Sequence, residues 1–251
     1  MFAKRFNIIV LAVDYSLAPE HPFPAALHDV CSSWRYVNEL HLRSLNNTLS
    51  PIESTFANHI DFDRIISAGD SAGANLAYRL SILARDKHIP IYPDFIYDTL
   101  AIRKNLIHLN VSYQILLFPG TGTLKKKEDV EKAYYLDEKF LDWFWASSIG
   151  VLNETEQLFI STVVDYEFAI NPLKTPQKGL PDALVVSGYR DPLFRDASQI
   201  VRQLKEEGVN ATLRMYDSMH SFHIFQFLKE SQDVYVQIES VLKERGLTGC
   251  K

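Results

Sequence analysis

Residues 65–76 read IISAGDSAGANL, and this stretch decides the fold of the chain. Its two isoleucines form a short apolar run that is typical of the end of a strand, and a run with helical spacing follows over 72–85. The pattern Gly-x-Ser-x-Gly leaves only small residues around Ser71, as a sharp strand-to-helix turn requires. Such a turn exposes the serine hydroxyl and points N–H groups of the helix start at the same place. The stretch therefore predicts a strand–turn–helix unit that presents Ser71 as a nucleophile.

The composition of the 251 residues is that of one globular α/β domain, with 47% hydrophobic and 23% charged residues and a net charge of −5. The longest basic run, 125–127, predicts a solvated loop and no nucleic-acid partner. No stretch approaches the ~20 apolar residues that a transmembrane helix needs. The two cysteines, Cys31 and Cys250, imply neither a disulfide framework nor a metal site. Cys31 lies in an apolar helical pattern, which predicts a buried thiol.

Strand and helix patterns alternate along the chain. The expected strands are 7–14, 64–69, 113–118, 183–187 and 211–216, and the expected helices are 25–40, 72–85, 137–149, 194–207 and 222–244. Residues 7–14 form a nearly continuous apolar run, which favours a strand buried on both faces. Residues 41–61 are interpreted as a surface loop, and 87–111 as a loop with a short helical turn. This alternation predicts a parallel sheet with helices on both faces.

An aromatic cluster in the expected helix 137–149 has two interpretations. Packing inside a core or a lid explains it simply, and an apolar wall over a substrate pocket is the functional alternative. A lid insertion is expected around 123–175. The hypothetical pocket residues are Asp70, Phe140, Trp143 and Trp145.

A serine hydroxyl attacks an ester only with help from a histidine that takes its proton and a carboxylate that holds the histidine. In parallel sheets such groups gather beyond the carboxyl ends of the strands. Asp191 follows the strand at 183–187, and His220 follows the strand at 211–216. The chain order Ser71, Asp191, His220 is the order found in α/β-hydrolases.

Each of these residues also has a structural alternative. Asp191 could cap the helix that follows it or form an Asp-Pro turn, and His220 could be a surface histidine. Two nearby residues, Asp196 and His223, fall inside the expected helices. Position, strand context and chain order together favour Asp191 and His220.

Four stretches resemble the hormone-sensitive-lipase group of α/β-hydrolases, which includes bacterial carboxylesterases and arylacetamide deacetylase. They are VDYSLAPEHPFPAA at 13–26, GDSAGANL at 69–76, GYRDPL at 188–193 and MHSF at 219–222. The resemblance implies an α/β-hydrolase fold and hydrolysis of carboxylic esters with small to medium acyl groups, or of acetylated amides, without a cofactor. Members of this group occur in the cytosol and at the endoplasmic reticulum, and the sequence does not indicate which of these compartments applies.

The same resemblance assigns roles to the site residues. Ser71 is the implied nucleophile, His220 the general base and Asp191 the residue that orients His220. The backbone N–H of Ala72 is the implied donor of an oxyanion hole. Ala74 and Ser221 replace glycines of many relatives by residues that are still small.

One departure from the family pattern is larger. Relatives carry a His-Gly-Gly-Gly segment before the stretch that corresponds to 13–26, and its N–H groups form most of the oxyanion hole. The 251 residues contain no such segment. The sequence therefore resembles a family member that lacks its N-terminal part, including a strand between 7–14 and 64–69 and the lid helices. Loss of a single oxyanion donor lowers turnover by ~10²–10³.

Two functions remain open on the sequence alone. The first is a serine carboxylesterase that acts on a small-molecule or lipid-like ester, and the three ordered residues favour it. The alternative is a catalytically inactive α/β-hydrolase fold that serves as a binding or interaction protein, and the missing oxyanion segment favours that reading. A third possibility concerns the origin of the sequence: it is a partial product of a longer gene, and the intact protein is an ordinary esterase.

Overall fold

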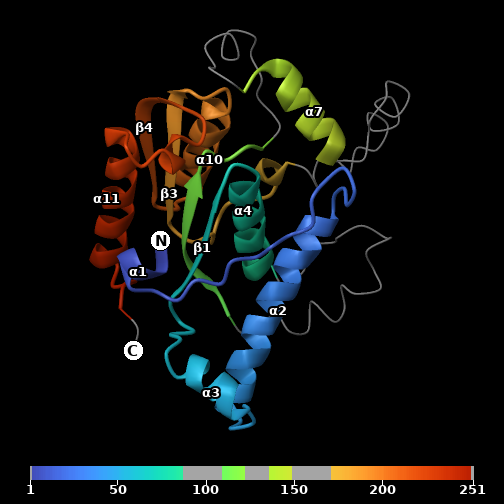
Figure 1. Ribbon diagram of the computed structural model, residues 1–251, viewed down its shortest axis with the longest axis vertical. Helices are drawn as coiled ribbons and strands as arrows, with labels where there is room; N and C mark the ends of the chain where they lie inside the picture. Colours follow the sequence, from blue (N-terminus) through green and yellow to red (C-terminus); the bar gives the residue numbers. More distant parts are fainter. Residues whose placement is uncertain (1, 87–108, 122–135, 149–170, 250–251) are drawn as a thin grey trace.

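The computed structural model describes residues 2–86, 109–121, 136–148 and 171–249. These ranges contain a parallel sheet in the order β1-β2-β3-β4 (Figure 1). The strands are β1 (Ile65–Asp70), β2 (Val111–Leu117), β3 (Ala183–Arg190) and β4 (Ala211–Met219). The predicted parallel sheet is confirmed, and all four strands end on the same side of the molecule.

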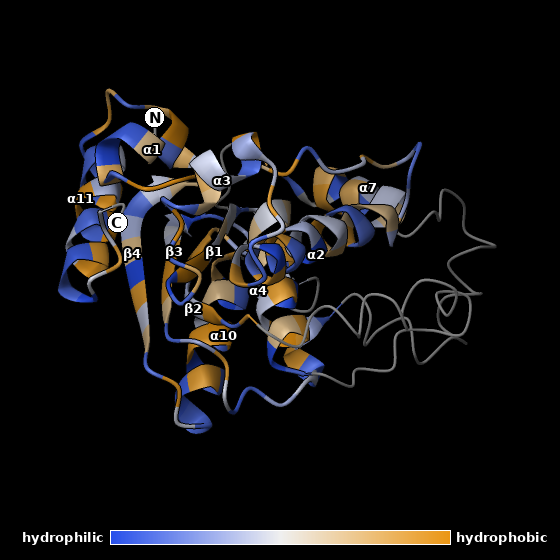
Figure 2. Cartoon of the chain, turned by 90° about the horizontal axis from the view of Figure 1, so that it is seen from below, coloured by the Kyte–Doolittle hydropathy of each residue, from blue (hydrophilic) through white to orange (hydrophobic). Residues whose placement is uncertain are grey.

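The described helices cover both faces of this sheet. They are α1 (Phe2–Phe6), α2 (Ala25–Leu45), α3 (Pro51–Ala57), α4 (Ala72–Arg85), α7 (Glu138–Ser148), α10 (Phe194–Glu206) and α11 (Lys229–Glu244). Two short 3₁₀ turns, η2 (Pro172–Lys174) and η3 (Phe222–Ile224), lie between them. Helices α4 and α10 pack on one face, α1 and α11 pack on the other, and α2 lies outside α4. Hydrophilic and hydrophobic residues alternate along the helices, as expected of helices with one buried face (Figure 2).

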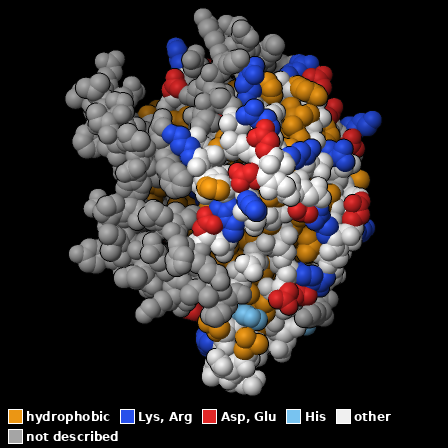
Figure 3. Space-filling model, turned by 180° about the vertical axis from the view of Figure 1, so that it is seen from behind, with side chains coloured by type: hydrophobic (Ala, Val, Ile, Leu, Met, Phe, Trp, Pro, Cys, Tyr) orange, Lys and Arg blue, Asp and Glu red, His pale blue; other side chains and the backbone are white. Residues whose placement is uncertain are grey.

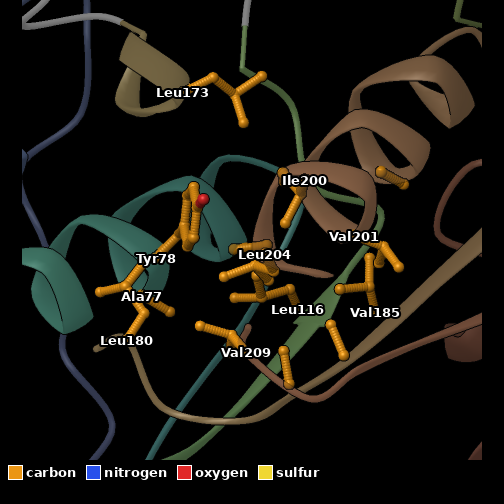
Figure 4. Packing of buried hydrophobic residues seen from close by; sticks show 14 of the residues in the cluster. Ala77, Tyr78, Leu116, Leu173, Leu180, Val185, Ile200, Val201, Leu204 and Val209 are labelled. Carbon is orange, nitrogen blue, oxygen red and sulfur yellow. The ribbon is translucent and has the colours of Figure 1, made fainter. Parts of the chain in front are cut away.

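The core has one cluster on each face of the sheet, because successive residues of a strand point to opposite faces. Leu116 and Val185 point towards α4 and α10, where they meet Tyr78 and Leu204 (Figure 4). Their neighbours in β2 and β3 pack against α1 and α11 on the other face; these are Ile115, Leu117, Leu184 and Val186. Burial on both faces explains the continuous apolar runs at 115–118 in and after β2 and at 183–186 in β3.

The predicted strand at 7–14 is wrong. Residues 8–17 form neither a helix nor a strand, and Ile9, Val10 and Leu11 are 49%, 48% and 57% exposed. An apolar run becomes a buried strand only where a neighbouring strand pairs with it. Within the described residues, β1 is hydrogen-bonded to β2 on one edge and to no strand on the other.

Two further boundaries differ from the predictions. The segment 41–61 is not a loop throughout, because α2 continues to Leu45 and α3 begins at Pro51. The sequence signal for α3 is a capping box, in which Ser50 and Glu53 exchange hydrogen bonds at the helix start. The final helix begins at Lys229, seven residues later than predicted, because the 3₁₀ turn η3 precedes it.

Several predictions fall wholly or partly on undescribed residues. Residues 87–108 of the expected loop lie outside the described ranges, as do Cys250 and most of the expected lid at 123–175. Cys31 is described, and its predicted burial is confirmed.

Two properties of the described surface concern possible partners. Acidic and basic side chains are interspersed on the face seen in Figure 3. Among the helices that the structure describes, none combines the length and apolar character needed to cross a membrane.

Candidate active site

Ser71 stands at the sharp turn between β1 and α4. Its backbone has φ 52° and ψ −118°, a region that non-glycine residues rarely occupy. The turn is possible because Gly69 has no side chain: a Cβ there would lie 2.2 Å from the carbonyl oxygen of Gly73. The Ser71 N–H donates to the carbonyl of Leu117 at 2.8 Å, which holds the turn against the end of β2.

A second close approach joins the ends of β3 and β4. A Cβ on Gly188 would lie 2.1 Å from the carbonyl oxygen of Ser218, so only glycine permits this contact. Asp191 follows directly after β3, and His220 follows directly after β4. The close contact therefore brings the loops that carry these two residues together.

The structure brings the three predicted residues into one hydrogen-bonded chain. His220 Nε2 lies 2.9 Å from Ser71 Oγ, and His220 Nδ1 lies 2.9 Å from Asp191 Oδ2. Asp191 is fully buried and His220 is 6% exposed, whereas Ser71 keeps partial exposure. A chain of this kind can move a proton from a hydroxyl to an imidazole while the carboxylate holds the ring.

The proposed capping role of Asp191 has a partial counterpart in the structure. Its Oδ1 accepts the N–H of Leu193 at 2.8 Å, so the carboxylate also orders the turn before α10. Helix α10 itself starts at Phe194 with no side-chain cap. The second oxygen, Oδ2, lies towards His220 and also accepts the hydroxyl of Ser187 at 3.4 Å.

The two alternative residues have other contacts. Asp196 is buried, and its Oδ2 accepts the N–H of Thr121 at 2.6 Å, which fixes the turn after β2. His223 is buried with its ring stacked on Phe118, and burial lowers the pKa of its imidazole. The negative charge of Asp70 opposes this lowering of the pKa, and His220 adds to it.

The structure separates the hypothetical pocket residues into two groups. Phe140 and Trp143 are more than half exposed on α7, and Asp70 is also exposed. Trp145 is half-buried against Leu193, two residues after Asp191, and a Cβ on Gly120 would lie 3.7 Å from its ring. Trp145 is thus the member of the aromatic cluster that lies beside the loop carrying Asp191.

Two contacts near the site were missed in the sequence. Phe118 packs edge-on against the His220 ring, with ring centroids 5.6 Å apart, and its φ of 53° places the side chain there. Asn75 donates to the carbonyl of Gly120 at 2.7 Å and so links α4 to the turn after β2. Phe118 is the last residue of the predicted strand 113–118 and Asn75 lies inside the predicted helix 72–85, and only the fold shows which residues their side chains contact.

Ala72 is the first residue of α4, and its N–H has no acceptor within the helix by position. The residue is exposed. Among the described residues, no group of three or more histidine, cysteine or acidic side chains is placed to hold a metal ion.

The comparisons with known proteins agree on one family. A family model described as the alpha/beta hydrolase fold matches residues 1–225. The chain is 28% identical over 208 residues to a carboxylesterase of Mycobacterium tuberculosis, covering 82% of this chain and 53% of that protein. It is 27% identical over 211 residues to a 3-O-acetylpapaveroxine carboxylesterase of Papaver somniferum, with 82% and 58% covered.

A solved structure of an esterase from Pyrobaculum calidifontis superposes with a TM-score of 0.71 at 26% identity. The match covers 98% of this chain and 69% of that one. The chain spans between 53% and 59% of the length of the first curated relatives it matches.

Proposed function

The chain belongs to the alpha/beta hydrolase fold family, and on that basis we propose that it hydrolyses carboxylic esters through Ser71. The observation that carries this proposal is the hydrogen-bonded chain from Ser71 through His220 to Asp191. The carboxylesterases and the esterase among its relatives support the same reaction class. The substrate class that follows is a small-molecule ester.

In the first half of the reaction, Ser71 Oγ attacks the ester carbonyl carbon while His220 Nε2 accepts the hydroxyl proton. The carbonyl oxygen becomes an oxyanion, and the N–H of Ala72 donates to it. The carbon–oxygen bond to the alcohol then breaks, and His220 returns the proton to the leaving alcohol. The product of this half is an acyl group on Ser71.

In the second half, water attacks the acyl carbon and His220 accepts its proton. Collapse of the second tetrahedral intermediate breaks the bond to Ser71 Oγ, which takes the proton back from His220. The carboxylic acid leaves. Asp191 stays ionised throughout, because its task is to orient the ring and to stabilise the imidazolium form.

The rate depends on how many donors reach the oxyanion. Ala72 is the one donor identified for it among the described residues, and each missing donor lowers turnover by ~10²–10³. We therefore expect this chain to be a slow esterase. The alternative is a binding protein of the same fold that has a triad and no turnover.

The test combines covalent labelling with turnover. A fluorophosphonate probe is expected to phosphonylate Ser71 Oγ with loss of fluoride, and a short-chain p-nitrophenyl ester is expected to be hydrolysed. Ser71→Ala should lose both signals, because it removes the proposed nucleophile.

The matched control is Ser198→Ala on α10. The Ser198 hydroxyl donates to the Phe194 carbonyl of its own helix and belongs to no part of the proposed triad. This variant should label and turn over as the parent does. Equal hydrolysis by the parent and Ser71→Ala would refute the proposal. Labelling of Ser71 without any turnover would favour the binding protein.

A further inference from the structure

Arg79 on α4 is a buried cation without an acidic partner. The residue is only 9% exposed, and burial lowers the pKa of its guanidinium to about 9. No carboxylate of the described residues lies within 4.0 Å of it. A buried charge that is not paired is costly, so a fold keeps one only where something compensates for it.

The other arginines show how unusual this is. Most of those described pair with a carboxylate at the surface, where pairing is least needed; they are Arg5, Arg43, Arg64, Arg85, Arg190, Arg202 and Arg245. Arg85, on the same helix, has Asp86 beside it. Arg79 is more deeply buried than these, and no described acidic residue neutralises it.

The surroundings of Arg79 hold its guanidinium through Nε and one ring face. Its Nε donates to Asn75 Oδ1 at 2.7 Å, and the Phe23 ring lies 5.7 Å from its central carbon. Asn75 is held in turn by its bond to the Gly120 carbonyl. Within the described residues, the two Nη groups have no hydrogen-bond partner. Two N–H groups in one plane match the two oxygens of a carboxylate.

Arg79 and Asn75 lie on one stripe of α4, and Ser71 directly precedes the helix. Ser71, Asn75 and Arg79 follow one another at intervals of four residues, and helical side chains lean towards the N-terminus. The bond to Asn75 shows that Arg79 leans in this direction, towards Ser71. One helical interval of four residues, about 6 Å, then separates the Asn75 level from Ser71. Both Ser71 and Asn75 keep partial exposure, whereas Arg79 is buried.

Two further elements border the same place. Residues 15–24 pass beside the end of α7, and the Phe23 N–H donates to the carbonyl of Ser148 (Figure 1). Trp145 of α7 lies against Gly120, which Asn75 also contacts. Aromatic faces therefore border the line from Ser71 to Arg79, as in a pocket for an alkyl chain with one polar anchor.

We propose that Arg79 binds a carboxylate of the substrate, so that the preferred substrates are esters that carry a second, anionic carboxyl group a few bonds from the scissile carbonyl. This inference rests on the proposed esterase function and adds the charge of the substrate to it. The Nη edge of Arg79 receives the carboxylate, Asn75 holds the guanidinium in place, and the ester carbonyl lies at Ser71.

The test compares two esters of equal acyl length. The p-nitrophenyl monoester of adipic acid is anionic at neutral pH, and p-nitrophenyl hexanoate is its neutral counterpart. The parent chain should have the higher kcat/KM for the adipate ester. Arg79→Met should lower this preference by about 10-fold to 100-fold, mainly through KM, because it removes a charged hydrogen-bonding partner. Hydrolysis of the hexanoate ester should stay within about 3-fold.

Two variants control for structure. Arg79→Gln also removes the charge but keeps an amide that can donate to Asn75, so it tests the same loss where Arg79→Met fails to fold. Arg202→Met removes an exposed arginine of α10 and should leave the preference unchanged. Hydrolysis of the hexanoate ester without any preference for the adipate ester would overturn the inference and leave the esterase function standing. An equal loss for both esters in both Arg79 variants would also overturn it.

A binding measurement separates this inference from the proposed function. Adipate should bind to Ser71→Ala, and its dissociation constant should rise at least about 10-fold when Arg79→Gln is added. Binding with this dependence and no hydrolysis by the parent chain would refute the esterase function and support the anion site. Equal adipate binding by Ser71→Ala with and without Arg79→Gln would refute the anion site.

Discussion

The ends of β1, β3 and β4 differ from the N-terminal segment 8–17 in how their sequence relates to their structure. At the strand ends, three residues up to 149 positions apart meet at 2.9 Å. In the segment, a run as apolar as any strand of the sheet is partly exposed, and no strand of the described ranges pairs with it.

The difference shows which constraints a sequence carries. The positions of Ser71, Asp191 and His220 follow from topology, because parallel strands that alternate with helices must end on one edge of the sheet. The apolar run at 8–17 carries only the potential for burial. Whether it becomes a strand depends on a partner beside it, and a single segment does not encode its partner.

The largest expected effect tests the strand ends directly. Asp191→Asn should lower kcat for a p-nitrophenyl ester by about 10⁴-fold, because the amide favours the wrong tautomer of His220 while keeping its shape. The control is Asp217→Asn, since Asp217 is exposed and pairs with Arg190 at the surface. Steady-state kinetics on both variants provides the measurement. A similar loss in both, or none in Asp191→Asn, would contradict the assigned orienting role.

The next effect concerns the turn that carries Ser71. Gly69→Ala should destabilise the fold by about 3 kcal/mol or more, because its Cβ would meet the Gly73 carbonyl at 2.2 Å and push β1 away from α4. Gly73 is the other glycine of the same motif, and a Cβ there meets nothing within 4 Å. Gly73→Ala should therefore be neutral or stabilise α4 by about 0.5–1 kcal/mol. Urea unfolding gives the free energy of unfolding of the two variants. Equal values would show that the close approach of Gly69 to the Gly73 carbonyl is unimportant.

Much of the fold and of the arrangement of the site was predictable from the sequence. The features that were not predicted have physical causes. The strand–turn–helix unit around Ser71 was predictable because small residues, apolar run and helical spacing all agree there. The start of the last helix was not, because η3 uses residues whose helical pattern is continuous with α11. Arg79 was missed because a helical arginine is usually solvated, and only its burial, with the Phe23 ring beside it, sets it apart.

A pair of leucines, one in the sheet and one in the N-terminal segment 8–17, compares the two regions by their contribution to the free energy of unfolding. Leu184 is fully buried in β3, whereas Leu11 is 57% exposed in the N-terminal segment. Leu184→Ala should cost about 2–5 kcal/mol because it removes buried methyl groups and leaves a cavity. Leu11→Ala should change the free energy of unfolding by less than about 0.5 kcal/mol. Chemical denaturation gives both values, and a large cost at Leu11 would mean that the segment is buried in solution.

The smallest effect concerns Cys31, which lies in the cluster on which the end of the N-terminal segment packs. Burial raises the pKa of its thiol to about 12. The thiol should therefore resist a disulfide reagent in the folded protein, which a Cys250→Ser background isolates, and react once urea unfolds the chain. Below the ordinary thiol pKa of 9.0 the folded and unfolded states both keep the proton, so stability is unaffected, whereas above 9.0 the unfolded state ionises first. Stability should thus fall as the pH rises from 9.0 towards about 12, and Cys31→Ala should remove that part of the slope. Rapid labelling of Cys31 in the folded protein would show that residues 13–23 do not cover α2 in solution. The whole N-terminal segment would then be exposed, as Ile9, Val10 and Leu11 are.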